Sequence, residues 1–305
     1  MFKFFENQKY SVILLVLGFL LIMAGFFELK DITKLNISSA RSEPIYAIAF
    51  LGTIFSLISI SVYLFDEKTL GWLSSKKIKK LEHGFGTKLL NSKINILFGR
   101  LESLSNEFEE AMVILPANEF FDDECINDSR SALGAYFNKK FTNQTEQIKE
   151  LILHELKDAK SLEVEKETNV MQKSYGVGKG VLLKNPMGSN QPVMLVAVTT
   201  KRAGEGLSAE LSYIFKAVNR IQSVAADNRI DTVFVPVMGS GHGGLKKEVA
   251  LFGLLLAICN GITKHNGHHI RNFNIVVFQG DDKTPPSVSK IISKRLLRTT
   301  TGMFS

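Results

Sequence analysis

The chain is poor in cysteine, with two residues of this type, Cys125 and Cys259, among 305. They lie far apart, and neither has a companion at the spacing of metal ligands. The sequence therefore indicates neither a disulfide framework nor a zinc site. It predicts two reduced thiols and no bound metal.

The sequence also lacks internal repeats and low-complexity segments, and its positive charge is not spread evenly. Much of the net charge of +7 comes from a lysine cluster at residues 76–80 and a basic tail at residues 290–298. A basic cluster next to an apolar run is typical of contact with anionic lipid. We therefore expect membrane lipid as a partner and no nucleic acid.

Two long apolar runs do occur, both within the first 65 residues. The first covers residues 10–29 and the second residues 44–65. A transmembrane helix needs roughly 20 apolar residues, so the sequence predicts a two-helix transmembrane hairpin at residues 1–65. A cleaved signal peptide is the alternative for the first run, but the run ends without a small-residue cleavage site, which favours an uncleaved helix.

The basic residues around these runs predict the orientation of the hairpin, because lysine and arginine are more frequent on the cytoplasmic side. Three of them lie between the runs. Seven lie before the first run or soon after the second: Lys3, Lys9, Lys68, Lys76, Lys77, Lys79 and Lys80. We expect a protein of the cell inner membrane with two spans and with both termini in the cytoplasm.

The pattern changes after the runs. Residues 66–92 are predicted to form a basic juxtamembrane linker, and residues 93–305 a folded domain in which short apolar runs alternate with helical patterns. The runs predict strands at residues 94–98, 111–115, 194–198, 232–236 and 274–278, and the helical patterns cover residues 129–141, 144–160, 207–227 and 245–262. This order indicates an α/β fold with a largely parallel sheet, in which ligands bind beyond the carboxyl ends of the strands.

The helix at residues 144–160 has two interpretations. Its apolar positions form either core or an oligomer surface, and core is the default. These positions are Ile148, Leu151, Ile152 and Leu156.

The first loop at a strand end contains Asn118, followed by an acidic cluster at residues 119–124. The asparagine side chain offers donors and acceptors that suit a ribose hydroxyl. The spacing alone favours a simpler interpretation, a turn asparagine in a solvated acidic loop.

The second loop, residues 127–134, opens a helix and has Asp128 or Ser129 as its predicted N-cap. Helix N-termini bind anions, and Arg130 adds a planar fork that suits a phosphate. As a lone feature, the loop favours capping over phosphate binding.

The third loop, residues 238–244, reads Met-Gly-Ser-Gly-His-Gly-Gly and runs directly into a helix. Its glycines allow the backbone to approach a pyrophosphate and to point N–H groups at it. A structural turn rarely uses so many glycines, so the sequence favours phosphate binding here. By itself, His242 indicates little, because a lone loop histidine usually has no ligand role.

Two segments together resemble a known family. Residues 112–118, Met-Val-Ile-Leu-Pro-Ala-Asn, resemble the strand-to-asparagine motif of macro domains, and residues 233–244 resemble their strand and phosphate-binding loop. Residues 96–101 look like the opening strand, and the resemblance covers about residues 93–280. It implies a macro-domain-like mixed sheet with flanking helices, preceded here by the transmembrane hairpin, and a ligand derived from ADP-ribose.

The resemblance also implies a site. Asn118 would contact a ribose, the loop at 129–134 would line the first phosphate loop, and the loop at 239–244 would surround the pyrophosphate. No catalytic residue is implied. The expected ligand-binding residues are Pro116, Ala117, Asn118, Asp122, Ser129, Arg130, Ser131, Leu133, Gly134, Gly239, Ser240, Gly241, His242, Gly243 and Gly244.

The chain departs from the family pattern in two places. Arg100 follows Gly99, where macro domains commonly have an aspartate that holds the adenine amino group. Residues 131–134, Ser-Ala-Leu-Gly, replace a triple-glycine stretch, which argues against a hydrolase that removes ADP-ribose from proteins. The resemblance therefore implies a binding protein with an altered adenine contact, not an enzyme.

A two-span hairpin ahead of a macro domain is similar to one class of effector in Thoeris anti-phage defence. In that class a TIR-domain partner makes an ADP-ribose-derived signal from NAD. The resemblance implies a membrane-anchored effector that binds this signal, forms ligand-dependent homo-oligomers and disrupts the membrane. Small residues such as Gly18 and Gly52 in the two runs permit close helix packing.

Two other interpretations stay open. A membrane-anchored ADP-ribose-processing hydrolase would need a base, for which Asp122, Asp123, Glu124 and His242 are candidates. A passive tether would bind ADP-ribosylated partners. Formation of a product separates the hydrolase from the binding proteins, and ligand-driven oligomerisation separates the effector from the tether.

Overall fold

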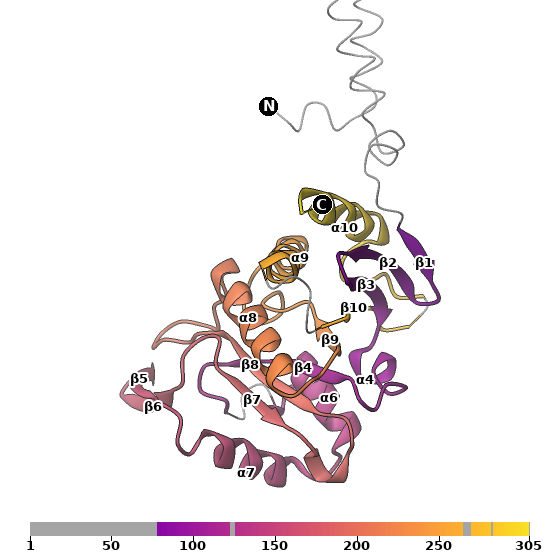
Figure 1. The fold of residues 1–305 in the computed structure, drawn as a ribbon. Coiled ribbons are helices and arrows are strands. Elements are labelled where there is room, and N and C mark those ends of the chain that lie inside the picture. The colour runs from indigo at the N-terminus through magenta and orange to yellow at the C-terminus, as the bar shows by residue number, and fades with distance from the viewer. Residues whose placement is uncertain (1–77, 123–125, 265–269, 282, 305) are drawn as a thin grey trace, which may run out of the picture. The chain divides into compact units, whose positions relative to one another are not determined.

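The computed structural model describes residues 78–122, 126–264, 270–281 and 283–304. Within them, eight strands form one sheet in the order β1-β2-β3-β10-β9-β4-β8-β7 (Figure 1). These strands are β1 (Lys79–Leu81), β2 (Gly84–Leu89), β3 (Ser92–Gly99), β4 (Met112–Asn118), β7 (Gly180–Leu183), β8 (Val193–Thr199), β9 (Thr232–Pro236) and β10 (Asn272–Phe278). Strands β5 (Leu162–Glu167) and β6 (Val170–Ser174) form a separate antiparallel pair.

The sheet is mixed, and its centre is parallel. Strands β3, β10, β9, β4 and β8 run in one direction, whereas β1, β2 and β7 pair antiparallel at the two sides. Parallel strands need crossover connections, which the helices supply. The predicted mixed α/β sheet with flanking helices is confirmed.

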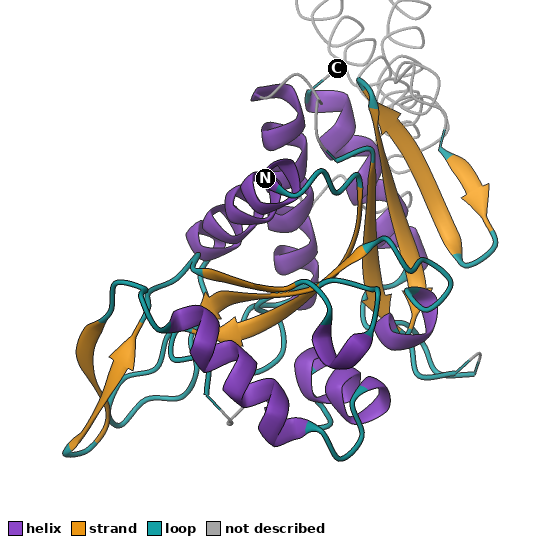
Figure 2. Ribbon diagram, turned by 60° about the horizontal axis from the view of Figure 1, so that its bottom comes forward, coloured by secondary structure: helices purple, strands orange, loops and turns teal. Residues whose placement is uncertain are grey.

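Helices cover both faces of the sheet (Figure 2). Helices α4 (Leu101–Leu104), α6 (Ala132–Lys140) and α7 (Thr145–Leu156) pack on one face. Helices α8 (Leu211–Asp227), α9 (Lys247–Lys264) and α10 (Lys290–Met303) pack on the other. A short 3-10 helix, Pro186–Gly188, lies between β7 and β8.

Two hydrophobic clusters fill the space between the sheet and its helices. In β4, Met112 and Ile114 belong to the α8–α9–α10 side, and Val113 and Leu115 belong to the opposite side. Successive side chains of a strand point to opposite faces, so a strand covered on both sides is apolar at every position. This explains why the central strands appear in the sequence as continuous apolar runs.

The five predicted strands and four predicted helices are all present, but others were missed. Strands β1 and β2 lie within residues 66–92, which the sequence predicted to be a linker. Each carries polar or charged residues because each has a side open to solvent, as the exposed Lys79, Lys80 and Lys88 show. Strands β5 and β6 and helix α10 were missed for the same reason, because many of their residues are polar or charged.

Helix α7 settles the choice left open for its apolar positions. Ile148, Ile152 and Leu156 are buried in the core, as the default interpretation predicted. Leu151 is partly buried and faces a groove at the sheet edge.

The predicted membrane location needs correction. In the part of the chain that the structure describes, no helix is both long enough and apolar enough to cross a bilayer. Helix α9 is the nearest in length, but it packs its apolar residues into the core between the sheet and its neighbouring helices. The two apolar runs at residues 10–29 and 44–65, and with them the predicted hairpin, lie outside the described residues.

Candidate functional site

Sheet order brings the predicted loops to one edge. Strand β4 lies between β9 and β8, and all three run parallel. The loops that follow Asn118, Thr199 and Pro236 therefore leave the same edge of the sheet side by side. This is the edge at which open α/β sheets bind ligands.

The loop after β9 is shaped by its glycines. Gly239 and Gly244 have φ angles of 77° and 75°, in the left-handed region that favours glycine. The Leu245 amide donates to the Gly239 carbonyl at 3.1 Å, and the Ala209 amide donates to the Gly243 carbonyl at 2.9 Å. The loop is therefore closed on itself and fixed to the segment that follows β8.

Five consecutive amide N–H groups in this loop have no acceptor within the described residues. They belong to Gly239, Ser240, Gly241, His242 and Gly243. A run of free N–H groups on a curved backbone is a favourable environment for an anion. The loop therefore offers free backbone donors, and its predicted binding of a phosphate stays a prediction.

Gly243 and Gly241 differ in the space that surrounds them. A Cβ at Gly243 would lie 2.7 Å from the Ala209 Cβ and 2.8 Å from the Gly239 oxygen, so glycine is required there by packing. At Gly241 a Cβ would meet no atom within 4 Å, and the φ angle is not positive. Neither packing nor backbone strain accounts for glycine at 241, and the space in front of it is free for a ligand.

Residues 128–134 face this loop through Asp128. The Asp128 Oδ2 lies 2.8 Å from the His242 Nε2, and Oδ1 accepts from the Arg130 amide at 2.9 Å and from its Nε at 3.0 Å. Bonds from the Arg130 side chain and amide lower the pKa of Asp128 from 3.8 to about 2, with a smaller contribution from His242. The structure therefore brings two predicted phosphate loops together and places Arg130 and His242 on one carboxylate.

The N-cap of α6 is Ser131, not Asp128 or Ser129 as predicted. The Ser131 hydroxyl accepts from the Gly134 amide at 2.8 Å. Asp128 is instead held by Arg130, and Ser129 is exposed. Leu133 and Gly134 are buried in the first turn of the helix, where they belong to the packed interior.

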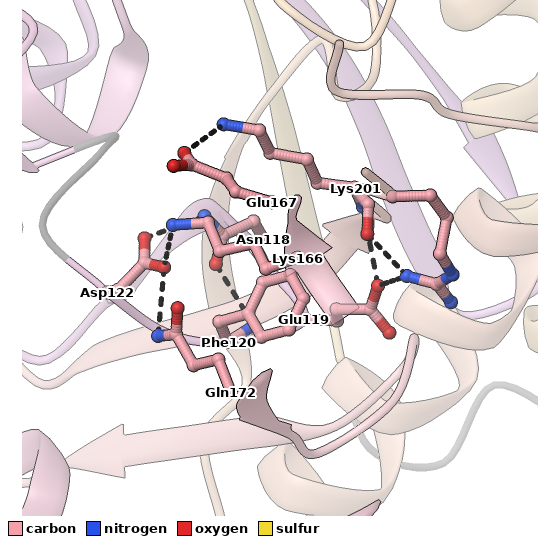
Figure 3. A network of polar contacts seen from close by, with 9 residues as sticks. Asn118, Glu119, Phe120, Asp122, Lys166, Glu167, Gln172 and Lys201 are labelled. Carbon is pink, nitrogen blue, oxygen red and sulfur yellow. Dashed lines mark hydrogen bonds and ion pairs between the residues drawn. The ribbon is translucent and has the colours of Figure 1, made fainter. Parts of the chain in front are cut away.

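Asn118 ends β4 as a buried residue, 1% exposed. Its Oδ1 accepts from the Phe120 amide at 3.0 Å and its Nδ2 donates to Asp122 at 2.9 Å (Figure 3). In this arrangement the side chain stabilises the turn after the strand. Its predicted contact with a ribose stays a prediction, as does that of the neighbouring Pro116 and Ala117.

Asp122 links this turn to the β5–β6 pair. Its Oδ2 lies 2.6 Å from the Lys166 Nζ and accepts from the Gln172 Nε2 at 3.2 Å. The carboxylate is thus held by three side chains, including Asn118. Asp123 and Glu124, the other carboxylates considered as bases, lie outside the described residues.

Glu119 forms a second network that the sequence analysis missed. The side chain is buried, and it accepts from the Ser174 hydroxyl at 2.5 Å and from the Lys201 amide at 3.3 Å. The Arg202 guanidinium also pairs with it. In the sequence, Lys201 and Arg202 follow the predicted strand at 194–198. Two adjacent basic residues are too common to indicate a contact with residue 119.

Arg100 lies where the family commonly has an aspartate, and it joins the ends of two strands. Its Nε donates to the Gly280 carbonyl at 3.3 Å, and its guanidinium lies 5.6 Å from the centre of the Phe278 ring. A cavity of about 560 Å³ opens nearby, lined by Gly99, Gly280, Asp281, Lys290 and other residues. The altered adenine contact expected from Arg100 stays a prediction.

Metal ligands are not gathered anywhere in the described residues. No group of three or more His, Cys, Asp and Glu side chains there is placed to hold an ion.

The family model described as "Thoeris protein ThsA, Macro domain" matches residues 94–277, more than half of the chain. Among solved structures, the chain is similar to the Oceanobacillus iheyensis macrodomain with ADP, at 9% identity over 74% of this chain and 96% of that chain, with a TM-score of 0.47. It is also similar to the Trypanosoma brucei macrodomain in complex with ADP, at 13% identity over 70% of each chain and a TM-score of 0.44.

A third similar structure is Thermosipho africanus DarTG in complex with ADP-ribose, at 13% identity over 72% of this chain and 47% of that chain, with a TM-score of 0.42. No curated protein matches the chain. The family match, together with the mixed sheet between two helical layers, assigns the domain to the macro-domain fold. Because the family match extends over more than half of its length, the chain belongs to the family of the Thoeris protein ThsA macro domain.

Proposed function

We propose that this chain is the sensor of a Thoeris-type defence system and that it binds an ADP-ribose-derived nucleotide between residues 128–134 and 239–244. The observation that carries the proposal is the run of five free N–H groups from Gly239 to Gly243, with open space at Gly241. A pyrophosphate satisfies such donors with its oxygens. Arg130 carries positive charge and bonds to Asp128, and His242 contacts the same carboxylate.

The family supports the choice of ligand and of biological role. The similar structures from Oceanobacillus iheyensis and Thermosipho africanus hold ADP and ADP-ribose, respectively. By this proposal a TIR-domain partner makes the signal from NAD, and the bound chain forms homo-oligomers without converting its ligand.

Binding and conversion are tested together with the purified full-length protein. ADP-ribose, ADP, NAD and the products of a TIR-domain enzyme acting on NAD are each added, and heat of binding and melting temperature are measured. A ligand at a hundred times its Kd stabilises the folded state by about 2.7 kcal/mol. The ligand is then recovered and analysed, and the size of the protein is measured by sedimentation.

Gly241→Val is the matched variant. The Cβ that it adds would meet no atom within 4 Å, so we expect an unchanged melting temperature, and we expect its bulk beside the free amides to abolish binding. Recovery of the ligand intact supports a sensor. Absence of binding by any nucleotide overturns the proposal, and conversion of the ligand supports a hydrolase instead.

A further inference from the structure

Strand β7 forms an open edge of the large sheet. It pairs with β8 alone among the described strands. The Ala197 amide donates to the Lys179 carbonyl at 2.9 Å, and bonded positions alternate along an antiparallel ladder. The backbone N–H and C=O groups of Val181 and Leu183 therefore face β8. Those of Gly180 and Leu182 point outward, where another strand is able to pair with them.

A groove runs along this edge. It has a volume of about 520 Å³ and lies between α7 on one face of the sheet and α8 on the other. Leu151, Leu182 and Val224 contribute apolar surface to it. The groove therefore lies directly beside the unpaired backbone groups of β7.

The charges of the groove favour an acidic occupant. Lys179, Lys184 and Arg220 line it, and within the described residues none of the three forms an ion pair. Two acidic residues, Glu155 and Asp227, also line it, so cations exceed anions by one (three against two).

The chain contains a segment that complements this groove. Strand β5, Leu-Glu-Val-Glu-Lys-Glu, belongs to a two-stranded sheet and pairs with β6 alone. Leu162 is 75% exposed, and Glu163 and Glu165 are also exposed. A strand with a free edge, exposed aliphatic surface and two exposed carboxylates matches a groove with outward backbone groups, an apolar lining and excess positive charge.

Strand β5 is also connected to the candidate ligand site. Lys166 of β5 pairs with Asp122, and Ser174 of β6 donates to Glu119. Both acceptors lie in the loop that follows β4. A ligand that displaces this loop therefore acts directly on the position of β5.

We propose that β5 of one copy adds to the β7 edge of a second copy and that this contact joins the copies when the protein self-associates. The inference rests on the self-association included in the proposed function. It joins two different surfaces, so it either closes reciprocally in a dimer or continues into a larger assembly.

The test uses the full-length protein, with and without ADP-ribose, in sedimentation at rising concentration. Leu182→Pro removes an outward N–H and no bond to β8. A second variant, Glu163→Lys with Glu165→Lys, changes only exposed side chains of β5, so it tests the contact even if Leu182→Pro misfolds. A third variant, Lys179→Glu with Arg220→Glu, reverses the charges of the groove. Lys80→Glu, at the opposite edge of the sheet, is the control.

We expect each of the three variants to weaken self-association by about tenfold or more. Mixing the two charge-reversed proteins should restore it, and the control should behave as the wild type. Self-association that none of the variants changes overturns the proposal.

A synthetic peptide of residues 160–168 makes the test independent of the nucleotide. We expect it to bind the wild-type protein and not Leu182→Pro. Failure to bind, or equal binding of a scrambled peptide, overturns the β5–β7 contact. Failure of ADP-ribose to bind while the peptide binds overturns the proposed ligand and leaves the contact standing.

Discussion

The Asp128 carboxylate lies 2.8 Å from the imidazole of His242 and joins two loops that are distant in the sequence. The same carboxylate holds Arg130, whose side chain is 85% exposed. Exposed ion pairs contribute little to stability, so in the proposed site a phosphate would replace Asp128 as the partner of Arg130 and His242. In the proposed site, the Asp128 carboxylate lies where a phosphate of the ligand would bind.

Replacing this carboxylate should strengthen nucleotide binding. Asp128→Asn removes one negative charge beside the expected phosphates and keeps the shape of the side chain. We expect the Kd for ADP-ribose to fall by about threefold to tenfold, as the removal of one nearby like charge predicts. Titration calorimetry measures the change, and raising the salt concentration should reduce it.

Asp158→Asn is the control for that variant, because it removes the same charge from an exposed position in the turn after α7. It should leave the Kd unchanged. Weaker binding by Asp128→Asn would show that Asp128 contacts the ligand favourably and does not compete with it.

The pH dependence of Asp128 follows from its lowered pKa. Bonds from Arg130 lower this pKa from 3.8 to about 2 in the folded protein. The contribution of Asp128 to stability is therefore complete above pH 3.8, where the unfolded chain is ionised, and is lost as the pH falls through about 2. Carboxyl chemical shifts followed by NMR from neutral to acid pH should show a midpoint near 2. A midpoint at or above 3.8 would mean that the contacts of Arg130 do not persist in solution.

Gly243→Ala should destabilise the protein, unlike Gly241→Val. The new Cβ would lie 2.8 Å from the Gly239 oxygen and 2.7 Å from the Ala209 Cβ, so the loop must shift. We expect a loss of about 1–3 kcal/mol in the free energy of unfolding, which is typical of overpacking. Urea denaturation of both variants measures the difference. Equal stability of the two would contradict the tight packing at residue 243.

Removal of the Glu119 carboxylate should destabilise the turn after β4. Glu119→Ala leaves the buried Ser174 hydroxyl without its acceptor and releases Arg202, whose side chain is 46% exposed. Because Arg202 regains water, we expect a loss of about 1–3 kcal/mol in the free energy of unfolding, less than a fully buried pair would give.

Glu110→Ala removes an exposed carboxylate and serves as the control in the same urea titration. It should change the free energy of unfolding by less than about 0.5 kcal/mol. A Glu119→Ala variant as stable as this control would show that the Glu119 network does not fix the turn.

The glycine loop and the helix that follows residue 131 show which features the sequence predicts and which it does not. Its composition predicted a phosphate-binding turn, and the structure gives that turn free N–H groups. The sequence also assigned an N-cap to Asp128 or Ser129, since both residue types cap helices, but Ser131 caps α6. A local pattern identifies residues able to cap, and only the path of the chain decides which of them reaches the first turn.

The sequence could not predict which side chains contact Asp122 and Glu119. Lys166, Ser174 and Arg202 come from the β5–β6 pair and from the loop after β8. No spacing rule connects them to residues 119 and 122, because the approach of these segments depends on how the sheet is ordered.

The sequence by itself determined the α/β pattern, the five central strands and the glycine loop, because apolar periodicity and glycine content act over short windows. The tertiary structure decided the rest: the pairing of Asp128 with His242, the salt bridge of Asp122 with Lys166, and the open edge of β7. These features arise when the sheet places β4 between β9 and β8 and leaves β7 at its side. That arrangement is set by the packing of the whole domain.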